Sequence, residues 1–226
     1  MDILPILTAQ ETLFPLGLTA RVAGLTLILH LVVGLGLGYL LSRKPFPGQT
    51  LLDFLVTLPL VFPPIATGFL LLFALGKHAP LGRLFTALTG KTIIFDFWGL
   101  VLAAFIAGLP LAVKPIQSAI QGSGSQLMEA AYVLGRSEWN AFLYVVLPNI
   151  KKVVAAGVFL AFARSLGEVG VTLMLGGNIE GKTNTLSLAI YNAVFNGEFE
   201  KALVLSAFLA LVSLTLFFIL KRLSAV

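Results

Sequence analysis

Few residues of this sequence could do chemistry, and the first are a charged pair inside an apolar stretch. Arg164 and Glu168 are four residues apart, so on a helix they share one face and can pair. Each charge costs about 2.5–3.5 kcal/mol at the centre of a bilayer on insertion scales, so both side chains should face each other or a polar cavity. The pair is either a self-neutralising intrahelical feature or part of a pathway or gate.

A second set of residues, 176–183, matches the phosphate-binding pattern GxxxxGKT. In a nucleotide-binding protein, backbone amides and Lys182 would hold phosphates, and Thr183 would bind magnesium. No aspartate follows Asp96 in the sequence, so the downstream aspartate that usually holds the magnesium is missing. We therefore interpret the match from Gly176 to Thr183 as false and expect an external loop that touches a partner protein.

No other set of residues suggests catalysis or metal binding. His30 and His78 are far apart and the chain has no cysteine, so neither histidine has the partners that a metal site needs. Serine, histidine and aspartate are present, but no spacing groups them into a triad. We expect no catalytic residues, no metal ligands and no cofactor on this chain.

The elements that must position these residues follow from the composition. Of 226 residues, 58% are hydrophobic and only 11% are charged, with a net charge of +5. A soluble domain has roughly 25% charged residues, and a chain with so few cannot cover a water-exposed surface. This excludes an ordinary soluble domain, a disordered chain and a nucleic-acid-binding module.

Charge-poor stretches predict an all-α integral membrane protein with about five transmembrane helices in a single domain, residues 1–226. A helix of about 20 residues rises roughly 30 Å, which is enough to cross the hydrocarbon core. The uncharged segment 183–197 carries three asparagines and is interpreted as a re-entrant or surface helix. The predicted spans are approximately 18–42, 51–76, 97–116, 153–177 and 201–221.

The second predicted span contains Pro59, Pro63 and Pro64. Proline removes a helical hydrogen bond, although neighbouring helices in a bundle can satisfy the freed carbonyl groups. These prolines either shape packing through a kink or widen a pathway near Phe62 and Ile65. Phe62, Pro63 and Pro64 are therefore candidate pathway or gate residues.

A long loop between the third and fourth spans, residues 123–148, is patterned as two short helices. Gly135 is expected to end the first helix, and Pro148 to close the second before the fourth span begins. Trp139, Phe142, Leu143 and Val146 form an apolar stripe on the second helix. The stripe either packs beneath the protein's own helices or docks a cytoplasmic partner.

The spacing within this loop resembles a known motif. Glu129-Ala130-Ala131, then three residues, Gly135, nine residues and a segment ending in Leu147-Pro148 match the EAA loop of ABC importer permeases. Only Val145 departs from the pattern, where isoleucine is usual. In that family the loop is the coupling helix that fits a groove in the ATPase subunit, so ATPase coupling is expected of these residues and of Trp139.

Two further segments resemble one branch of that family. Residues 162–191, FARSLGEVGVTLMLGGNIEGKTNTLSLAIY, are similar to molybdate permeases, which carry FARSLGEFGAT, GNIPG and a TQTL-like segment; Val169 replaces the usual aromatic residue. Residues 58–72 resemble their LPLVLPP segment. Tungstate permeases share GGNI and sulfate permeases an RALGE-like segment, so the resemblance implies molybdate transport, with tungstate or sulfate as alternatives.

The resemblance implies a type I ABC importer permease fold in the cytoplasmic (inner) membrane. Expected partners are a second copy of the chain, a dimer of separate ATPase subunits that carry the ATP and magnesium, an external binding protein and membrane lipid. Eight basic residues on one side against six on the other favour an external amino terminus and an internal carboxyl terminus. The alternatives from other classes are an ATP-independent anion channel or carrier and a phosphate-loop enzyme.

Overall fold

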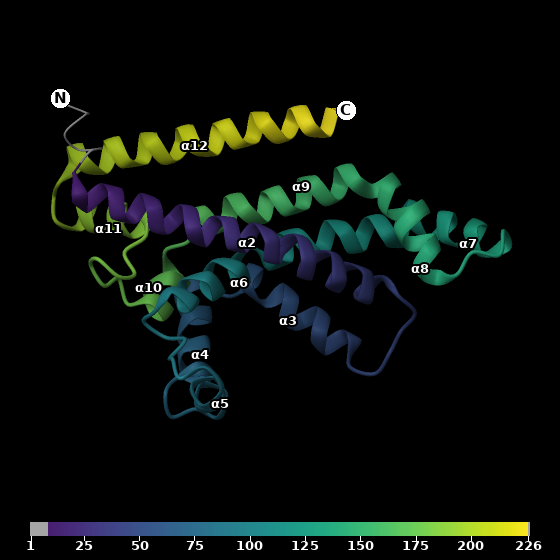
Figure 1. Ribbon diagram of the computed structural model, residues 1–226, viewed down its shortest axis with the longest axis horizontal. Coiled ribbons are helices and arrows are strands. Elements are labelled where there is room, and N and C mark those ends of the chain that lie inside the picture. The colour runs from purple at the N-terminus through teal and green to yellow at the C-terminus, as the bar shows by residue number, and fades with distance from the viewer. Residues whose placement is uncertain (1–8, 226) are drawn as a thin grey trace.

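The computed structural model describes residues 9–225, and its regular elements are helices, which confirms the all-α class. Four long helices run along the longest axis of the molecule (Figure 1): α2 Gln10–Ser42, α6 Phe97–Ala119, α9 Leu147–Leu166 and α12 Phe199–Ala225. The shorter elements are α3 Gln49–Val61, α4 Pro64–Leu75, α5 Pro80–Thr89, α7 Ser125–Val133, α8 Glu138–Ala141, α10 Gly170–Gly176, α11 Leu186–Phe195 and two π-helical turns, η1 Ile120–Gly124 and η2 Phe142–Val146.

Helix α6 is the centre of the bundle, because α2 and α9 both pack on it. Small residues make this possible: a Cβ added to Gly34 of α2 would lie 2.9 Å from the Cβ of Ala112, and one added to Gly108 would lie 2.5 Å from the carbonyl oxygen of Ala161 on α9. Such close approaches of backbones are a common packing device between membrane helices. The three helices therefore form one closely packed unit.

His30 contributes to the same unit. Its ring is fully buried, stacks on Phe105 at 5.3 Å between centroids and donates from Nε2 to the carbonyl oxygen of Phe105 at 2.9 Å. This bond joins α2 to α6 inside an apolar interior, where a polar group requires a partner. Within residues 9–225, no group of three histidine, aspartate or glutamate side chains is placed to hold a metal ion.

The predicted span 51–76 is divided into α3 and α4. Phe62 and Pro63 are extended, with ψ values of 144° and 136°, and Pro64 begins α4. Two consecutive prolines cannot donate backbone hydrogen bonds, and the residue before a proline avoids the helical region. The segment is therefore broken and not merely kinked.

The predicted span 153–177 is also divided. Helix α9 ends at Leu166, and α10 begins at Gly170. Glu168 thus lies between two helices, which corrects the expectation of a charged pair within one continuous helix. The spans 18–42, 97–116 and 201–221 each fall within one helix, respectively α2, α6 and α12.

By length and apolar composition, three continuous helical stretches among the described residues could cross a membrane. A fourth is counted only if α4 and α5, which meet at 63°, are taken as one bent span. The segment 183–197 contains the short helix α11, which packs against α12 and α2. The three continuous stretches are Gln10–Ser42, Phe97–Val133 and Glu138–Leu166.

Pro148 does not close a short helix, contrary to the sequence expectation. One helical stretch runs from Glu138 to Leu166 and passes through Pro148. The π-helical turn η2 ends at Val146, two residues before this proline, and the Asn149 side chain donates to the carbonyl oxygen of Val145 at 2.6 Å. A wider turn relieves the clash of a proline ring with the preceding turn, so the chain continues without a break.

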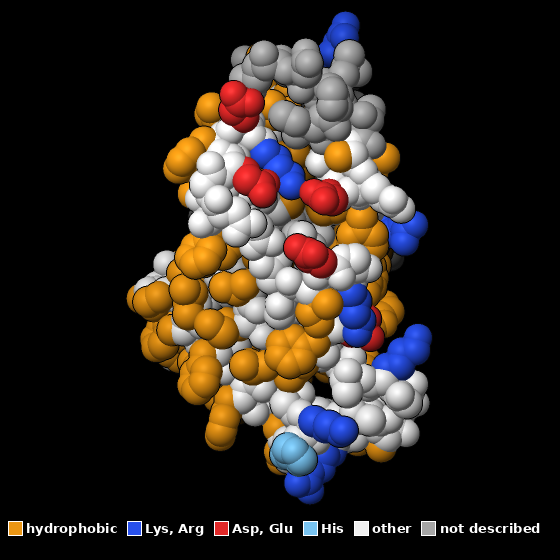
Figure 2. Space-filling view, turned by 90° about the vertical axis from the view of Figure 1, so that its left-hand side faces the viewer, with side chains coloured by type: hydrophobic (Ala, Val, Ile, Leu, Met, Phe, Trp, Pro, Cys, Tyr) orange, Lys and Arg blue, Asp and Glu red, His pale blue; other side chains and the backbone are white. Residues whose placement is uncertain are grey.

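The two ends of the bundle differ in character. Figure 2 shows one end, with acidic side chains gathered around a basic one and hydrophobic side chains over a flank. Lys201 on α12 lies 3.0 Å from Glu11 on α2 and 3.2 Å from Glu198. These ion pairs hold the first and last helices together there, while the opposite end carries η1, α7, α8 and η2 (Figure 1).

Candidate functional site

The first candidate site is the elbow, which we define as residues 120–146, comprising η1, α7, α8 and η2. Its reversal of direction depends on Gly135, which has φ +77°. The Gly135 N–H donates to the carbonyl of Tyr132 and the Arg136 N–H to that of Ala131, at 2.9 and 3.0 Å. This pattern ends a helix at a left-handed residue, for which glycine is favoured. Gly135 therefore ends α7, as predicted.

The motif residues divide between the two faces of the elbow. Ala131 is buried, Glu129 and Ala130 are exposed, and Leu147 is half-buried. Pro148 is exposed at the start of α9. The small side chain of Ala131 lets the two helices of the elbow pack closely, while Glu129 remains available to another molecule.

The apolar stripe also divides. Phe142 and Val146 are buried in a cluster with Tyr39, Ile116 and Ile120. They pack beneath the protein's own helices, as one of the two sequence interpretations proposed.

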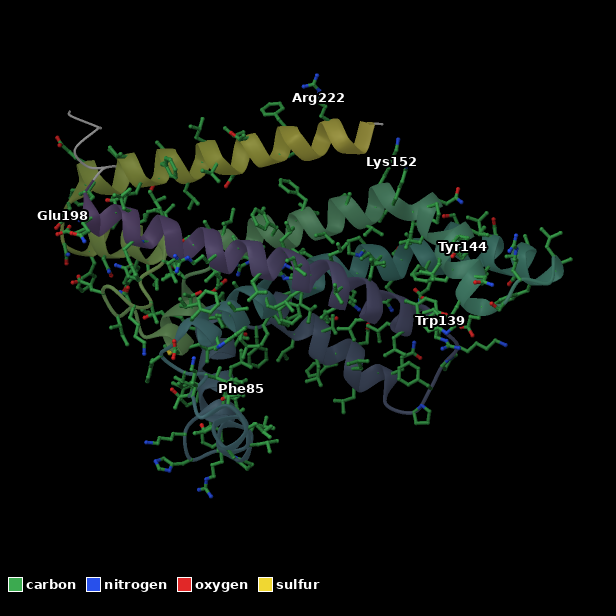
Figure 3. All side chains as sticks on the ribbon, viewed as in Figure 1. Phe85, Trp139, Tyr144, Lys152, Glu198 and Arg222 are labelled. Atoms are coloured by element: carbon green, nitrogen blue, oxygen red, sulfur yellow. The ribbon has the colours of Figure 1, made fainter. Side chains whose placement is uncertain are left out.

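Other apolar side chains of the elbow face outwards. Val133 is 88% exposed, Leu134 81%, Trp139 61% and Tyr144 74%. Figure 3 shows Trp139 and Tyr144 at the end of the molecule that carries the elbow. Exposed apolar groups of this kind favour an interaction surface, so docking of a partner through Trp139 stays a prediction, whereas Phe142 and Val146 pack inside the protein.

A cleft of about 760 Å³ separates the elbow from the end of α2. Partial burial raises the pKa of the Tyr132 phenol in its wall, and the charge of Glu138 raises that pKa further. The Tyr132 phenol is uncharged at neutral pH, as an unperturbed phenol already is. Glu138 itself was not marked by any motif in the sequence, and it is bonded across the cleft to Tyr39 and Arg43.

The second candidate site is the charged pair, which the structure does bring together. Arg164 Nη1 lies 2.5 Å from Glu168 Oε2. The Glu168 side chain is 1% exposed, and its other oxygen accepts the backbone N–H of Val171 at 2.7 Å. The carboxylate therefore caps the start of α10 while it holds Arg164, whose side chain remains 35% exposed.

The breaks in the two divided spans adjoin each other. Helix α4 packs along α10, and Gly170, just after Glu168, lies against Pro64 and Ile65. Phe62 and Pro63 are exposed beside this contact. The structure thus gathers Phe62, Pro63 and Pro64 near the charged pair, although nothing in their sequence spacing predicts it.

In residues 176–183, which match the phosphate-loop pattern, the polar groups bond to one another. Thr183 is fully buried, donates its hydroxyl to the carbonyl of Gly176 at 2.7 Å and accepts the N–H of Ile179 at 2.8 Å. The N–H groups of Lys182 and Thr183 both donate to the Ile179 carbonyl. A phosphate loop needs such amides and the threonine hydroxyl directed at the ligand, whereas here they hold the loop itself together.

Comparison with known proteins identifies the family to which the chain is similar. The family model described as "Binding-protein-dependent transport system inner membrane component" matches residues 31–225. The molybdenum transport system permease protein ModB of Azotobacter vinelandii is 37% identical over 212 residues, covering 91% of this chain and 94% of that protein. The sulfate transport system permease protein CysW of Escherichia coli K12 is 34% identical over 212 residues, covering 91% and 72%.

A solved structure has the same fold. A bacterial ABC transporter involved in the import of the acidic polysaccharide alginate aligns with a TM-score of 0.77, covering 98% of this chain and 82% of that one, at 16% identity. Identity this low shows a shared architecture and says nothing about the solute.

Proposed function

Because the chain belongs to the family of binding-protein-dependent transport system inner membrane components, we propose that it is the permease subunit that carries molybdate across the cytoplasmic membrane, powered by a separate ATPase. Chemistry on ATP and magnesium takes place on that partner, and this chain contributes the pathway. The family does not favour an ATP-independent channel or carrier.

The elbow carries the proposal. It presents the exposed Glu129, Trp139 and Leu134 on a compact projection at one end of the bundle. A projection with an aromatic anchor and an apolar tip suits a groove on another protein, where such residues supply much of the binding energy. Closure of two ATPase subunits around nucleotide then moves the elbow, and the bundle alternates between inward-facing and outward-facing states.

The orientation follows from where basic residues lie. Lys152 lies toward the end of the molecule that carries the elbow, and Glu198 is at the other end (Figure 3). Basic residues are enriched on the cytoplasmic side of membrane proteins. The elbow therefore faces the cytoplasm, with the amino terminus outside and the carboxyl terminus inside.

A second copy of the chain completes the pathway on a two-fold axis. Supporting this, α3 and α4 expose large apolar side chains, among them Phe54 at 57%, Phe69 at 56% and Phe73 at 77%. An external binding protein delivers the oxyanion to the end opposite the elbow. Arg164, whose side chain is 35% exposed beside Glu168, attracts the anion, and residues 62–64 form the adjoining gate.

Molybdate is favoured over sulfate because the molybdenum permease matches nearly end to end, whereas the sulfate permease is longer than this chain. The test is uptake of labelled molybdate into proteoliposomes that contain this chain, its ATPase and its binding protein. We expect uptake that requires ATP hydrolysis and is blocked more strongly by excess tungstate than by excess sulfate. Uptake without the ATPase would support a channel or carrier, and preferential sulfate uptake would reassign the solute.

A further inference from the structure

We infer that Glu138 is a positioning residue that attaches the elbow to the end of α2, so that movement of the elbow reaches α2 directly. The inference rests on the proposed function, since it assumes that a partner moves the elbow. It concerns the transmission step inside this chain, and no sequence motif marks the residues involved.

The two covalent connections of the elbow to the bundle differ in regularity. The connection from α6 passes through η1, where Gly122 has non-helical backbone angles of φ −81° and ψ −113°. The connection to α9 passes through η2. Gly122 breaks the connection from α6, whereas η2 only widens one turn of the continuous helical stretch from Glu138 to Leu166. The elbow is therefore held to the bundle by one regular connection and one broken one.

Glu138 supplies a third, non-covalent connection. The Tyr39 hydroxyl donates to Glu138 Oε1 at 2.7 Å, and Arg43 Nη2 lies 2.8 Å from the same oxygen and 2.9 Å from Oε2. The Tyr39 ring also packs on Phe142 at 4.4 Å and on Trp139 at 5.4 Å between centroids. One turn of α2 therefore holds α8 through both polar and aromatic contacts.

The exposure of Arg43 and Glu138 indicates that their ion pair orients α8 relative to α2 more than it stabilises the fold. The side chains of Arg43 and Glu138 are 46% and 39% exposed, and ion pairs at that exposure contribute little to stability. They do fix the relative orientation of two elements, because a carboxylate bonded to two donors at once has little freedom. Loss of Glu138 should therefore loosen the attachment without unfolding the chain.

Helix α2 continues from this attachment to the charged pair. It packs along α6 and α9, and its residues Thr19 and Thr26 line a small internal cavity together with Glu168 and Thr172. The Thr19 hydroxyl also accepts the backbone N–H of Leu186 at 2.8 Å, which joins α2 to the start of α11. A shift of α2 thus bears on the break between α9 and α10, which places Glu138 at the cytoplasmic end of a continuous mechanical connection.

The test measures molybdate transported per ATP hydrolysed by the complete transporter in proteoliposomes. Glu138→Ala should lower this ratio about tenfold, the size of a typical coupling between sites, while assembly with the ATPase and thermal stability stay unchanged. Tyr39→Phe, which removes only the hydroxyl, should lower the ratio less. The exchanged pair Arg43→Glu with Glu138→Arg should restore it in part.

The matched control is Asp53→Asn. It breaks the ion pair between Asp53 and Lys114, which has a distance of 2.6 Å and similar exposure but joins α3 to α6 and contains no residue of the elbow. This variant should keep the wild-type ratio.

A covalent cross-link between positions 43 and 138 tests whether the attachment itself, and not folding stability, determines the ratio of molybdate transported to ATP hydrolysed. The chain has no cysteine, so Arg43→Cys with Glu138→Cys can be joined by a short bismaleimide. The ratio should be low before joining and recover afterwards. An unchanged ratio in Glu138→Ala, or no recovery on joining, would overturn the inference while the proposed function stood; absence of ATP-dependent uptake by the wild type would overturn the proposed function itself.

Discussion

Gly170 lies against Pro64, so that a Cβ added to Gly170 would stand 2.8 Å from the Pro64 Cβ and 3.1 Å from the Ile65 nitrogen. Each of these residues begins a helix just after a break in a predicted span. The contact brings the proline-rich break beside Glu168. Two interruptions that lie more than 100 residues apart thus form one place where helices change direction.

Replacement of Gly170 by alanine should disturb both breaks. The new methyl group meets proline and backbone atoms that cannot rotate away, and overpacking of this kind costs typically about 1–3 kcal/mol. We expect a lower melting temperature and reduced uptake, measured on purified protein and in proteoliposomes. Gly24→Ala in α2 is the control, because a Cβ there meets nothing within 4 Å. Equal behaviour of the two variants would contradict the contact.

The charged pair gives a second prediction. Glu168→Ala should destabilise the chain by about 1–3 kcal/mol, because it leaves the buried Val171 N–H without its acceptor and the partly exposed Arg164 without its partner. Arg164→Ala combined with Glu168→Ala should recover much of that stability and still fail to transport. Thermal unfolding in detergent and uptake distinguish the outcomes: recovery of both would assign the pair a structural role only.

The elbow gives a third prediction, in which two neighbouring aromatic residues behave differently. Trp139 is 61% exposed, so Trp139→Ala should weaken binding to the ATPase and leave the melting temperature nearly unchanged. Phe142 is 5% exposed, so Phe142→Ala should cost about 3–5 kcal/mol of folding stability through a cavity. Co-purification with the ATPase and thermal unfolding measure the two effects. Trp139→Ala with full affinity would argue against docking at this surface.

The sequence predicted the helical class and the elbow for identifiable reasons. Charge-poor runs reveal apolar helices whatever their packing, and the glycine at position 135 predicts a chain reversal because a positive φ is needed there. The prolines at 63 and 64 predicted only a kink within one span, whereas the structure shows a break at Phe62. These signals are local, so they survive without knowledge of the fold.

Other features depend on contacts between distant residues. Tyr39 and Glu138 are 99 residues apart, and no spacing rule relates them. Glu168 looked helical because Arg164 precedes it by four residues, but the carboxylate instead caps α10. The continuation of the helix through Pro148 depends on η2, whose widened turn is not visible in the residue pattern.

The last prediction concerns the loop that resembles a phosphate-binding loop. Thr183→Ala removes two hydrogen bonds in a buried position, one to the Gly176 carbonyl and one from the Ile179 N–H, and should cost about 1–3 kcal/mol by leaving those groups unsatisfied. Lys182 is exposed, so Lys182→Ala should change neither stability nor ATP-driven uptake. In a true nucleotide site the lysine would be indispensable, since it neutralises the phosphates. Loss of uptake in Lys182→Ala, together with nucleotide binding by the purified chain alone, would therefore show that the loop binds phosphate after all.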